Sequence, residues 1–433
     1  MEPLEGITVI ELALAVQGPA AGVYLRDMGA EVIKVEPPIG DPSRYGRNRN
    51  NDTPPGTLGA QFVAVNRGKR SVCLDLTTKE GMSALHKLIA KADVFYSNYR
   101  MPALKALGLD YETLHAAYPQ LVYGHVNGFG PQGEDAEKAM LDGAAVARGG
   151  LLSLTGPADG KPHLPGAVIG DTGGAMHMAL AIMTALFAKE RGAGGQLVQT
   201  SALGTQLWLQ QWELTHVGMT GVNLSRSGSH HPNIMGGYGV YETSDGGAIV
   251  LATSMQLEAY DALCIFAEIP ELAIDPRVHT PGQRLGEGLD DEDSQYIRDK
   301  LAEGFKKKTA AQWDAFLRTQ PEIIWERVRT YTEVLEDPQN VINGYISTVD
   351  VPGVGEVRTV GNLVSLSETP GSTKGAPPQL GADNEELLAW AGVEQSAIQA
   401  VTAHAVATRE ALLAEAAQLN EALAEQIAAI KGN

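Results

Sequence analysis

The sequence predicts an α/β protein, in which a large domain with a parallel sheet is accompanied by a smaller α+β domain. Two runs rich in β-branched residues, 6–12 and 31–36, flank a short helical segment that ends at a glycine. This order is a βαβ unit, which joins parallel strands. A chain of 433 residues is also longer than one ordinary core requires, which favours two domains.

Strand and helix continue to alternate through the first 200 residues or so. Further strands are predicted at 70–76, 93–99 and 121–129. An amphipathic helix is predicted over 78–92, because its apolar residues Met82, Leu85, Leu88 and Ile89 recur at helical spacing. Residues 1–224 are therefore predicted to form the first part of the large domain.

The chain changes character after Thr200. We predict one long helix over 202–221, a polar glycine-rich stretch, and a hairpin over 240–254 with Asp-Gly-Gly at its turn. Residues 225–330 are predicted to form the small domain. Residues 331–393, which contain a second hairpin, return to the large domain, and the alanine-rich residues 394–433 form a helical extension.

The composition argues against several classes of protein. A net charge of −19 disfavours a nucleic-acid partner, and no apolar run approaches the length of a membrane span. Cys73 and Cys264 stand far apart without a CxxC motif, which indicates a reducing, cytoplasmic location. The N-terminus has no basic segment before its apolar run, so a signal peptide is not expected.

Positive charge is concentrated near the N-terminus. Residues 1–105 hold 13 basic against 11 acidic residues, whereas the remainder holds 20 against 41. The basic residues gather at 44–51 and 66–71. This pattern fits either a solvated surface of mixed charge or a local anion-binding site.

Asp171, in the stretch "IGDTGGAMHM", is the first candidate for chemistry. An aspartate at this place is a good helix N-cap. The helix terminus would also keep the carboxylate ionised, as a nucleophile requires. Gly173 and Gly174 would leave room for a substrate to approach. The local pattern leaves both interpretations open.

Two glycine-containing segments are further candidates. The turn "AVQGPAAG" presents backbone N–H groups at a helix start, where phosphate can bind, but it is not GxGxxG. It carries Gln17, whose amide can donate or accept a hydrogen bond. The segment 234–239, "IMGGYG", is either a connection between domains or a mobile loop over a site. His230 and His231 lack further ligands at metal spacing, so no metal is expected.

Taken in order, these segments resemble the class III CoA-transferase family (CaiB/BaiF type, formyl-CoA transferase-like) as far as about residue 393. The matching stretches include "PLEGITVIELALAVQGPAAG", "NRGKRSVCLDLTTKEG", "GAVIGDTGGAMHMALAIMTALFAKE" and "APPQLGADNEELL". The resemblance implies a Rossmann-like large domain and an interlocked homodimer. It also implies acyl-CoA and carboxylic acid substrates, with coenzyme A as the group exchanged.

The same resemblance assigns roles to individual residues. Asp171 would be the nucleophile, forming an aspartyl anhydride and then an aspartyl-CoA thioester. Gln17 would lie near the thioester, and Gly236 and Gly237 would belong to a loop that closes over the site. The residues implied to bind CoA are Val16, Arg67, Lys69, Arg70, Asn98, Tyr99, Arg100 and Lys105.

Two other functions remain open at this point. The α-methylacyl-CoA racemases share the fold but need a histidine where this chain has Leu141, before Asp142, and His125 stands well upstream. Some family enzymes are hetero-oligomers, so a homologous partner subunit is the second alternative. Arg148 would bind an acidic acceptor, or pair with Asp142 or Glu134.

Side chains for an acyl pocket are a further prediction. Trp208, Trp212, Met235 and Tyr238 would line it, with core packing as the alternative for the two tryptophans.

Overall fold

The computed structural model describes residues 1–45 and 57–431. Packing divides the chain into two compact units. The large unit comprises Met1–Gly149, Val168–Trp208 and Leu335–Asn433, and the small unit comprises Gly150–Ala167 and Leu209–Val334. The sequence prediction had placed residues 150–167 and 209–224 with the large domain, and this division places them with the small unit.

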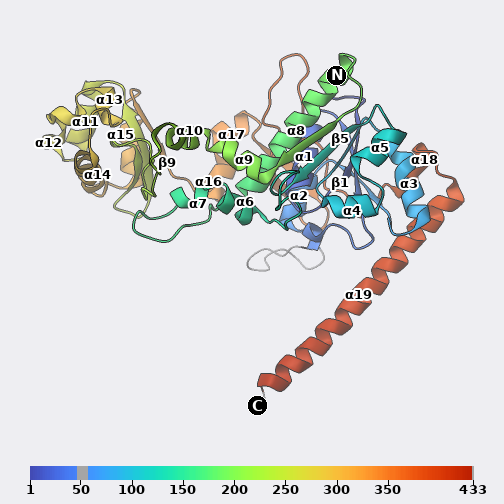
Figure 1. Cartoon of the computed structure of the whole chain (residues 1–433). Coiled ribbons are helices and arrows are strands. Elements are labelled where there is room, and N and C mark those ends of the chain that lie inside the picture. Colours follow the sequence, from blue (N-terminus) through green and yellow to red (C-terminus); the bar gives the residue numbers. More distant parts are fainter. Residues whose placement is uncertain (46–56, 432–433) are drawn as a thin grey trace. The chain divides into compact units, whose positions relative to one another are not determined.

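The large unit is built on a parallel sheet that contains β1 and β5 (Figure 1). The sheet has six strands in the order β3-β2-β1-β4-β5-β6. The strands are β1 (Thr8–Leu12), β2 (Glu31–Glu36), β3 (Arg70–Cys73), β4 (Val94–Ser97), β5 (Val122–Asn127) and β6 (Leu197–Ser201). This order is that of a doubly wound Rossmann sheet. The predicted parallel α/β fold is confirmed.

Helices cover both faces of this sheet, because successive residues of a strand point to opposite faces. Val9 packs with α1 (Gln17–Asp27) and α8 (Ile169–Glu190) on one face. Ile10 packs on the other face with α3 (Lys79–Ile89), α4 (Met101–Ala106), α5 (Tyr111–Ala117) and α18 (Asn384–Trp390). The large unit also contains η1 (Pro42–Tyr45), α2 (Ala60–Asn66), α6 (Asp142–Arg148) and α17 (Pro338–Ile342).

The prediction of one long helix over 202–221 is wrong. The chain forms α9 (Ala202–Leu209) and α10 (Gln211–Thr220), interrupted at Gln210, where φ is −115° and ψ is 24°. Gln210 is 4% exposed, so tertiary packing sets its conformation. Every residue of the segment before Gly221 tolerates a helix, and propensity alone cannot reveal such a break.

The small unit combines an antiparallel sheet with helices. Strands β7 (Gly239–Glu242), β8 (Ala248–Ser254) and β9 (Ile323–Arg327) pair in that order, which confirms the predicted hairpin over 240–254. Tyr241, Phe305 and Trp313 stack at the centre of its core. The other elements are α7 (Leu151–Leu154), α11 (Leu257–Phe266), α12 (Pro270–Ala273), η2 (Pro276–Val278), α13 (Pro281–Arg284), α14 (Asp291–Phe305), α15 (Ala310–Leu317) and α16 (Tyr331–Glu336), which ends within the large unit.

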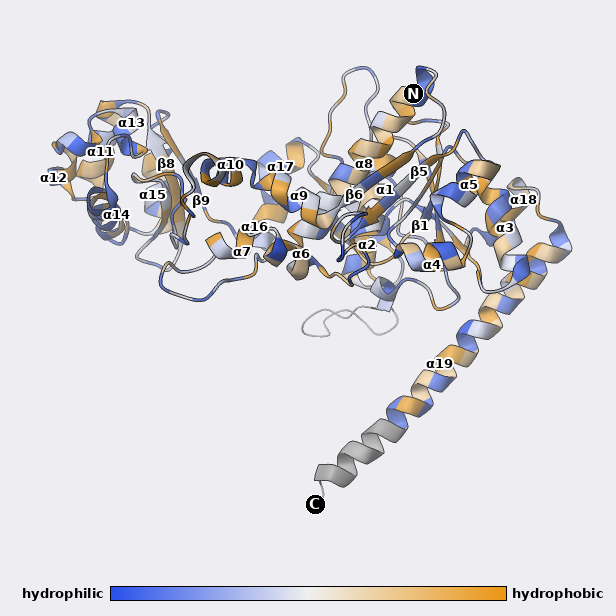
Figure 2. Cartoon of the chain, viewed as in Figure 1, coloured by the Kyte–Doolittle hydropathy of each residue, from blue (hydrophilic) through white to orange (hydrophobic). Residues whose placement is uncertain are grey.

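The C-terminal part of the chain adds a hairpin and a long helix to the large unit. The second predicted hairpin is formed by β10 (Ile346–Val351) and β11 (Gly355–Val360). Helix α19 (Gln395–Lys431) begins against the core through Ile398, Val401 and Ala405. Hydrophobic and hydrophilic residues alternate along its part up to Glu421 (Figure 2).

Candidate active site

A cavity of about 440 Å³ opens where the strands of the large sheet end. Its wall comes from the segments that follow β1, β4 and β5, together with Asp171 and residues 136–141. Strands β1 and β4 lie side by side at the point where the winding of the sheet reverses. In doubly wound sheets this switch point, at the carboxyl ends of the strands, is the usual place for a ligand.

Asp171 lines this cavity from the first turn of α8. It is not the N-cap, as one interpretation of the sequence had it, because the helix begins at Ile169 and Val168 precedes it. Asp142 performs the capping instead. Its Oδ1 accepts hydrogen bonds from the backbone N–H groups of Gly170 (2.7 Å) and Asp171 (3.1 Å).

This arrangement raises the pKa of Asp171 to about 6, mainly because the carboxyl is buried and further because of the neighbouring negative charge of Asp142. The sequence prediction was that the helix terminus would keep this carboxylate ionised. The N–H groups of that terminus point to Asp142, and burial outweighs their influence. About nine in ten of the carboxyls are nevertheless ionised at pH 7.

Gln17, the first residue of α1, lies beside the same part of α8. Its Nε2 donates to the carbonyl oxygen of Asn127 (3.3 Å). A Cβ atom added to Gly174 would lie 2.6 Å from the Gln17 Nε2. Gly174 thus makes room for Gln17, and the clearance for a substrate that the sequence suggested stays a prediction.

The structure brings one group of predicted CoA-binding residues together. Val16, Asn98, Tyr99 and Arg100 line the cavity that contains Gln17 and Asp171. They follow β1 and β4, so the adjacent carboxyl ends of these strands bring them together. Lys105, in α4, is exposed and does not line this cavity.

The basic residues of the second predicted cluster lie elsewhere, in internal ion pairs. Arg67 pairs with Asp27 (2.7 Å), and Lys69 pairs with Glu11 (2.7 Å); all four side chains are buried. Arg70 pairs with Asp383 (2.8 Å) and Glu386 (2.6 Å). These charges are neutralised within the chain, so they form no open anion site here, and their role in CoA binding stays a prediction.

Most of the first predicted basic cluster, 44–51, lies outside the described residues. Its first member, Arg44, is buried and bonded to Glu36 (2.6 Å). Arg148 pairs with Asp135, which was not one of its two predicted partners.

The glycine segment 234–239 belongs to the small unit and packs against α13 and α14. Gly237 N–H donates to the carbonyl oxygen of Arg284 (2.9 Å), and a Cβ atom at Gly236 would collide with that oxygen. Arg298 holds the carbonyl groups of Ile234 (2.8 Å) and Gly236 (3.1 Å). The glycines are required here by packing within the small unit, and closure over Asp171 stays a prediction.

Sequence reasoning missed one residue of the site and one feature of the sheet beside it. His125 was judged too far upstream, yet it lines the cavity, because β5 ends beside β4. Its Nε2 lies 2.9 Å from the Tyr99 carbonyl oxygen and must carry the proton, and burial lowers the pKa of the ring. The missed feature of the sheet is the set of charged residues within buried strands, Glu11, Lys34 and Glu36, whose signal was a charge inside a β-branched run.

Over residues 1–45 and 57–431, no three or more His, Cys, Asp or Glu side chains come together as metal ligands. In the same part of the chain, no helix has both the length and the apolar character needed to cross a bilayer.

The large unit is thus a doubly wound α/β domain with a half-buried carboxylate facing the cavity at its switch point. Residues 4–384 match CoA-transferase family III. The chain is 33% identical over 388 residues to succinyl-CoA–D-citramalate CoA-transferase of Chloroflexus aurantiacus, covering 89% of this chain and 93% of that protein. It is 29% identical over 396 residues to human succinyl-CoA:glutarate CoA-transferase, covering 90% and 86%.

A solved structure agrees with these relatives. A CaiB/BaiF family protein from Brucella suis superposes with a TM-score of 0.78 at 30% identity, covering 90% of this chain and 99% of that one. The chain therefore belongs to CoA-transferase family III, as the sequence predicted, and is an enzyme.

Proposed function

We propose that the enzyme moves CoA from an acyl-CoA thioester to an acceptor carboxylic acid, with Asp171 as the nucleophile. The observation that carries this proposal is the position of Asp171. It is a half-buried carboxylate, facing a cavity of about 440 Å³, with a pKa that leaves it ionised at neutral pH.

The reaction proceeds by acyl exchange on that carboxylate. An oxygen of Asp171 attacks the thioester carbonyl carbon; a C–O bond forms, the C–S bond breaks, and CoA leaves as the thiolate. The thiolate then attacks the carboxyl carbon of Asp171. This releases the donor as its carboxylate and leaves an aspartyl-CoA thioester. The acceptor carboxylate repeats the two steps in reverse, which regenerates Asp171.

Val16, Gln17, Asn98, Tyr99 and Arg100 are the residues we propose to contact the CoA thioester, because they share the cavity with Asp171. The anhydride must be kept from water, since hydrolysis would end the exchange. We assign that role to the segment containing Gly236 and Gly237, as the resemblance implied.

The substrates we propose are a dicarboxylyl-CoA donor, such as succinyl-CoA, and a dicarboxylate acceptor. The citramalate and glutarate enzymes among the relatives support this class by name. Within the described wall of the cavity, Arg100 and Lys138 supply positive charge. Such charge suits both the anionic CoA and a second carboxylate.

Racemisation is not favoured as an alternative. Leu141 occupies the place of the required histidine. His125 reaches the cavity, but its Nε2 proton is given to the Tyr99 carbonyl.

We further propose that the enzyme acts as an interlocked homodimer. Exposed apolar residues on one side of α8, Met176, Leu180 and Phe187, support a contact with a second subunit. A homologous partner chain is the alternative. Light scattering of the purified chain distinguishes a dimer from a monomer awaiting a different subunit.

The test of the transfer reaction uses Asp171→Asn with Glu190→Gln as the matched control. Glu190 ends the same helix and is exposed. Incubation with succinyl-CoA and glutarate, followed by mass spectrometry, should find acyl or CoA mass on the Asp171 peptide of the wild type and the control. A fully active Asp171→Asn enzyme would refute the mechanism. Exchange of the α-proton in deuterated water, without acid transfer, would favour the racemase.

A further inference from the structure

A row of polar side chains crosses the interior of the large sheet. One residue from each of four neighbouring strands belongs to it, and each is paired in register with the next and 0% exposed: Ser71 in β3, Lys34 in β2, Glu11 in β1 and Tyr96 in β4. A parallel sheet that is covered on both faces normally carries apolar residues there. The row therefore calls for a physical explanation.

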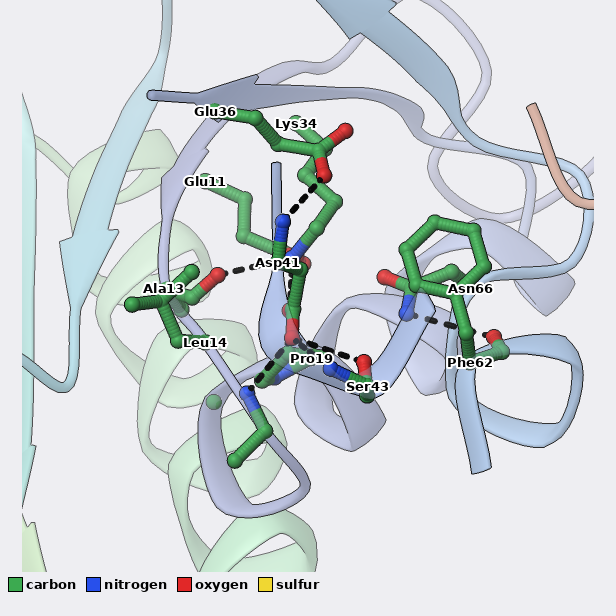
Figure 3. A network of polar contacts seen from close by, with 12 residues as sticks. Glu11, Ala13, Leu14, Pro19, Lys34, Glu36, Asp41, Ser43, Phe62 and Asn66 are labelled. Atoms are coloured by element: carbon green, nitrogen blue, oxygen red, sulfur yellow. Dashed lines mark hydrogen bonds and ion pairs between the residues drawn. The ribbon is translucent and has the colours of Figure 1, made fainter. Parts of the chain in front are cut away.

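The charges of this region are balanced and directly paired. Lys34 contacts Glu11 (3.2 Å) and Asp41 (3.0 Å), with all three side chains fully buried (Figure 3). Burial opposes the charge on Lys34, but the surrounding carboxylates outweigh it and raise its pKa. Burial likewise opposes the charge on Asp41, and Lys34 with Ser43 lowers its pKa. We call Glu11, Lys34, Asp41 and Lys69 the buried charge cluster.

The cluster binds the backbone that leaves β1. Lys34 Nζ donates to the carbonyl oxygen of Ala13 (2.7 Å) (Figure 3). Asp41 Oδ1 accepts from the N–H of Ala15 (3.3 Å). Ala15 has a φ of 63°, which is unfavourable for a residue with a side chain. These bonds offset the strain and satisfy polar groups that the end of the strand leaves without ladder partners.

Two further side chains form hydrogen bonds with the backbone of this turn. Lys69 Nζ donates to the carbonyl oxygen of Pro19 (2.7 Å). Asn98 pairs with Leu14 like a neighbouring strand, accepting from its N–H (2.9 Å) and donating to its carbonyl (2.8 Å). The turn from residue 13 to 19 is thus held mainly by side chains from other segments.

The turn contains two residues that line the cavity beside the proposed nucleophile. Val16 and Gln17 follow Ala15 directly and line the cavity with Asp171. Gln17 lies against Gly174, one helical turn beyond Asp171. The path of the turn therefore sets where the Gln17 amide stands relative to the nucleophile.

We propose that Lys34 and Asp41 are positioning residues for CoA transfer, which hold Val16 and Gln17 in place through the backbone of Ala13 and Ala15. This inference rests on the proposed function. Buried ion pairs add little net stability, but the loss of one partner is strongly destabilising because it leaves a buried charge uncompensated. We infer that this penalty holds the turn in one conformation. Misplacing a reacting group by about 1 Å can reduce a rate about 100-fold.

The test uses Asp41→Asn, which keeps the size and an acceptor oxygen but removes the charge that faces Lys34. The matched control is Asp27→Asn, which also breaks a buried pair, with Arg67, at the far end of α1. We expect kcat for CoA transfer to fall about 10–100-fold in Asp41→Asn. The control should lose a similar amount in Tm but keep kcat within about twofold.

A double-mutant cycle with Gln17→Ala separates positioning from general damage. If Asp41 acts through the turn, Asp41→Asn should reduce kcat much less when Gln17 is already absent. Additive effects, or equal losses of kcat in Asp41→Asn and Asp27→Asn, would overturn the proposal.

Hydrogen exchange gives a readout that does not need a folded variant or an active enzyme. The backbone N–H groups of Leu14 and Ala15 should exchange slowly in the wild type, because Asn98 and Asp41 accept their hydrogen bonds. Fast exchange there would overturn the proposal. A wild type that transfers no CoA would instead contradict the proposed function, since the exchange result does not depend on activity.

Discussion

Asp142→Asn should shift the acid limb of the pH–rate profile for CoA transfer to lower pH. The asparagine keeps an oxygen to accept from the N–H groups of Gly170 and Asp171, so the cap of α8 is preserved. It removes the negative charge that helps to raise the pKa of Asp171. Burial is the larger cause of the raised pKa and remains in the variant. The pKa of Asp171 should therefore stay above the usual aspartate value of 3.8.

The size of the effect follows from ionised fractions. With a pKa of about 6, roughly one in ten Asp171 carboxyls is ionised at pH 5. A fall of about one pH unit in the variant would raise that fraction to about one half. At pH 7 and above, both enzymes should have similar fractions, so the difference should appear on the acid side.

The assay is the pH profile of kcat/KM between about pH 4.5 and 8, which reports the ionisation of the free enzyme. The matched control is Asp110→Asn, because Asp110 caps α5 in the same unit and does not line the cavity. A wild-type limb near pH 4 would refute the raised pKa of Asp171. If the acid limb of the Asp142→Asn profile stays at the wild-type pH, or shifts to higher pH, the electrostatic role of Asp142 is refuted.

Three further substitutions test the packing around the site and the fold. Gly174→Ala should displace Gln17 and lower kcat about tenfold or more, measured as CoA transfer by a folded variant. Gly236→Ala should destabilise the small unit by about 1–3 kcal/mol, measured by thermal unfolding, because its Cβ collides with the Arg284 carbonyl oxygen. Ile398→Ala should cost about 2–5 kcal/mol in denaturant unfolding, since this side chain anchors α19 in the core.

The two stability predictions each have a control of the same chemistry. Gly218→Ala, at an open position in α10, should leave the small unit as stable or stabilise it by about 0.5–1 kcal/mol. Leu412→Ala, at an exposed position of α19, should change stability by less than about 0.5 kcal/mol. Wild-type kcat in Gly174→Ala, or equal unfolding of test and control variants, would contradict the packing described.

The strands and the main helices of the large unit could be predicted from sequence because their signal is local. The runs 6–12 and 31–36 are β-branched, and the apolar spacing over 78–92 is helical, so each segment specifies its own structure. The break at Gln210 could not be predicted, because it depends on the burial of one side chain among residues that all tolerate a helix.

The sequence by itself led to the prediction that Asp171 is the nucleophile, through the ordered matches around it, and that role stays a proposal. Only the tertiary structure decided which residue caps the helix and what pKa the Asp171 carboxyl has. Asp142, 29 residues away, took over the helix cap. Burial raised the pKa that the isolated helix terminus would lower.

Sequence alone also failed to reveal the partners of the basic residues near the N-terminus. Composition identified the charges of Arg67 and Lys69, but not the buried carboxylates of Asp27 and Glu11, 40 and 58 residues away, that neutralise them. Sequence patterns report neighbours within a few residues, whereas electrostatic interactions depend on atoms within a few ångströms in space. The fold therefore decided which charged side chains line the cavity and which are paired inside the protein.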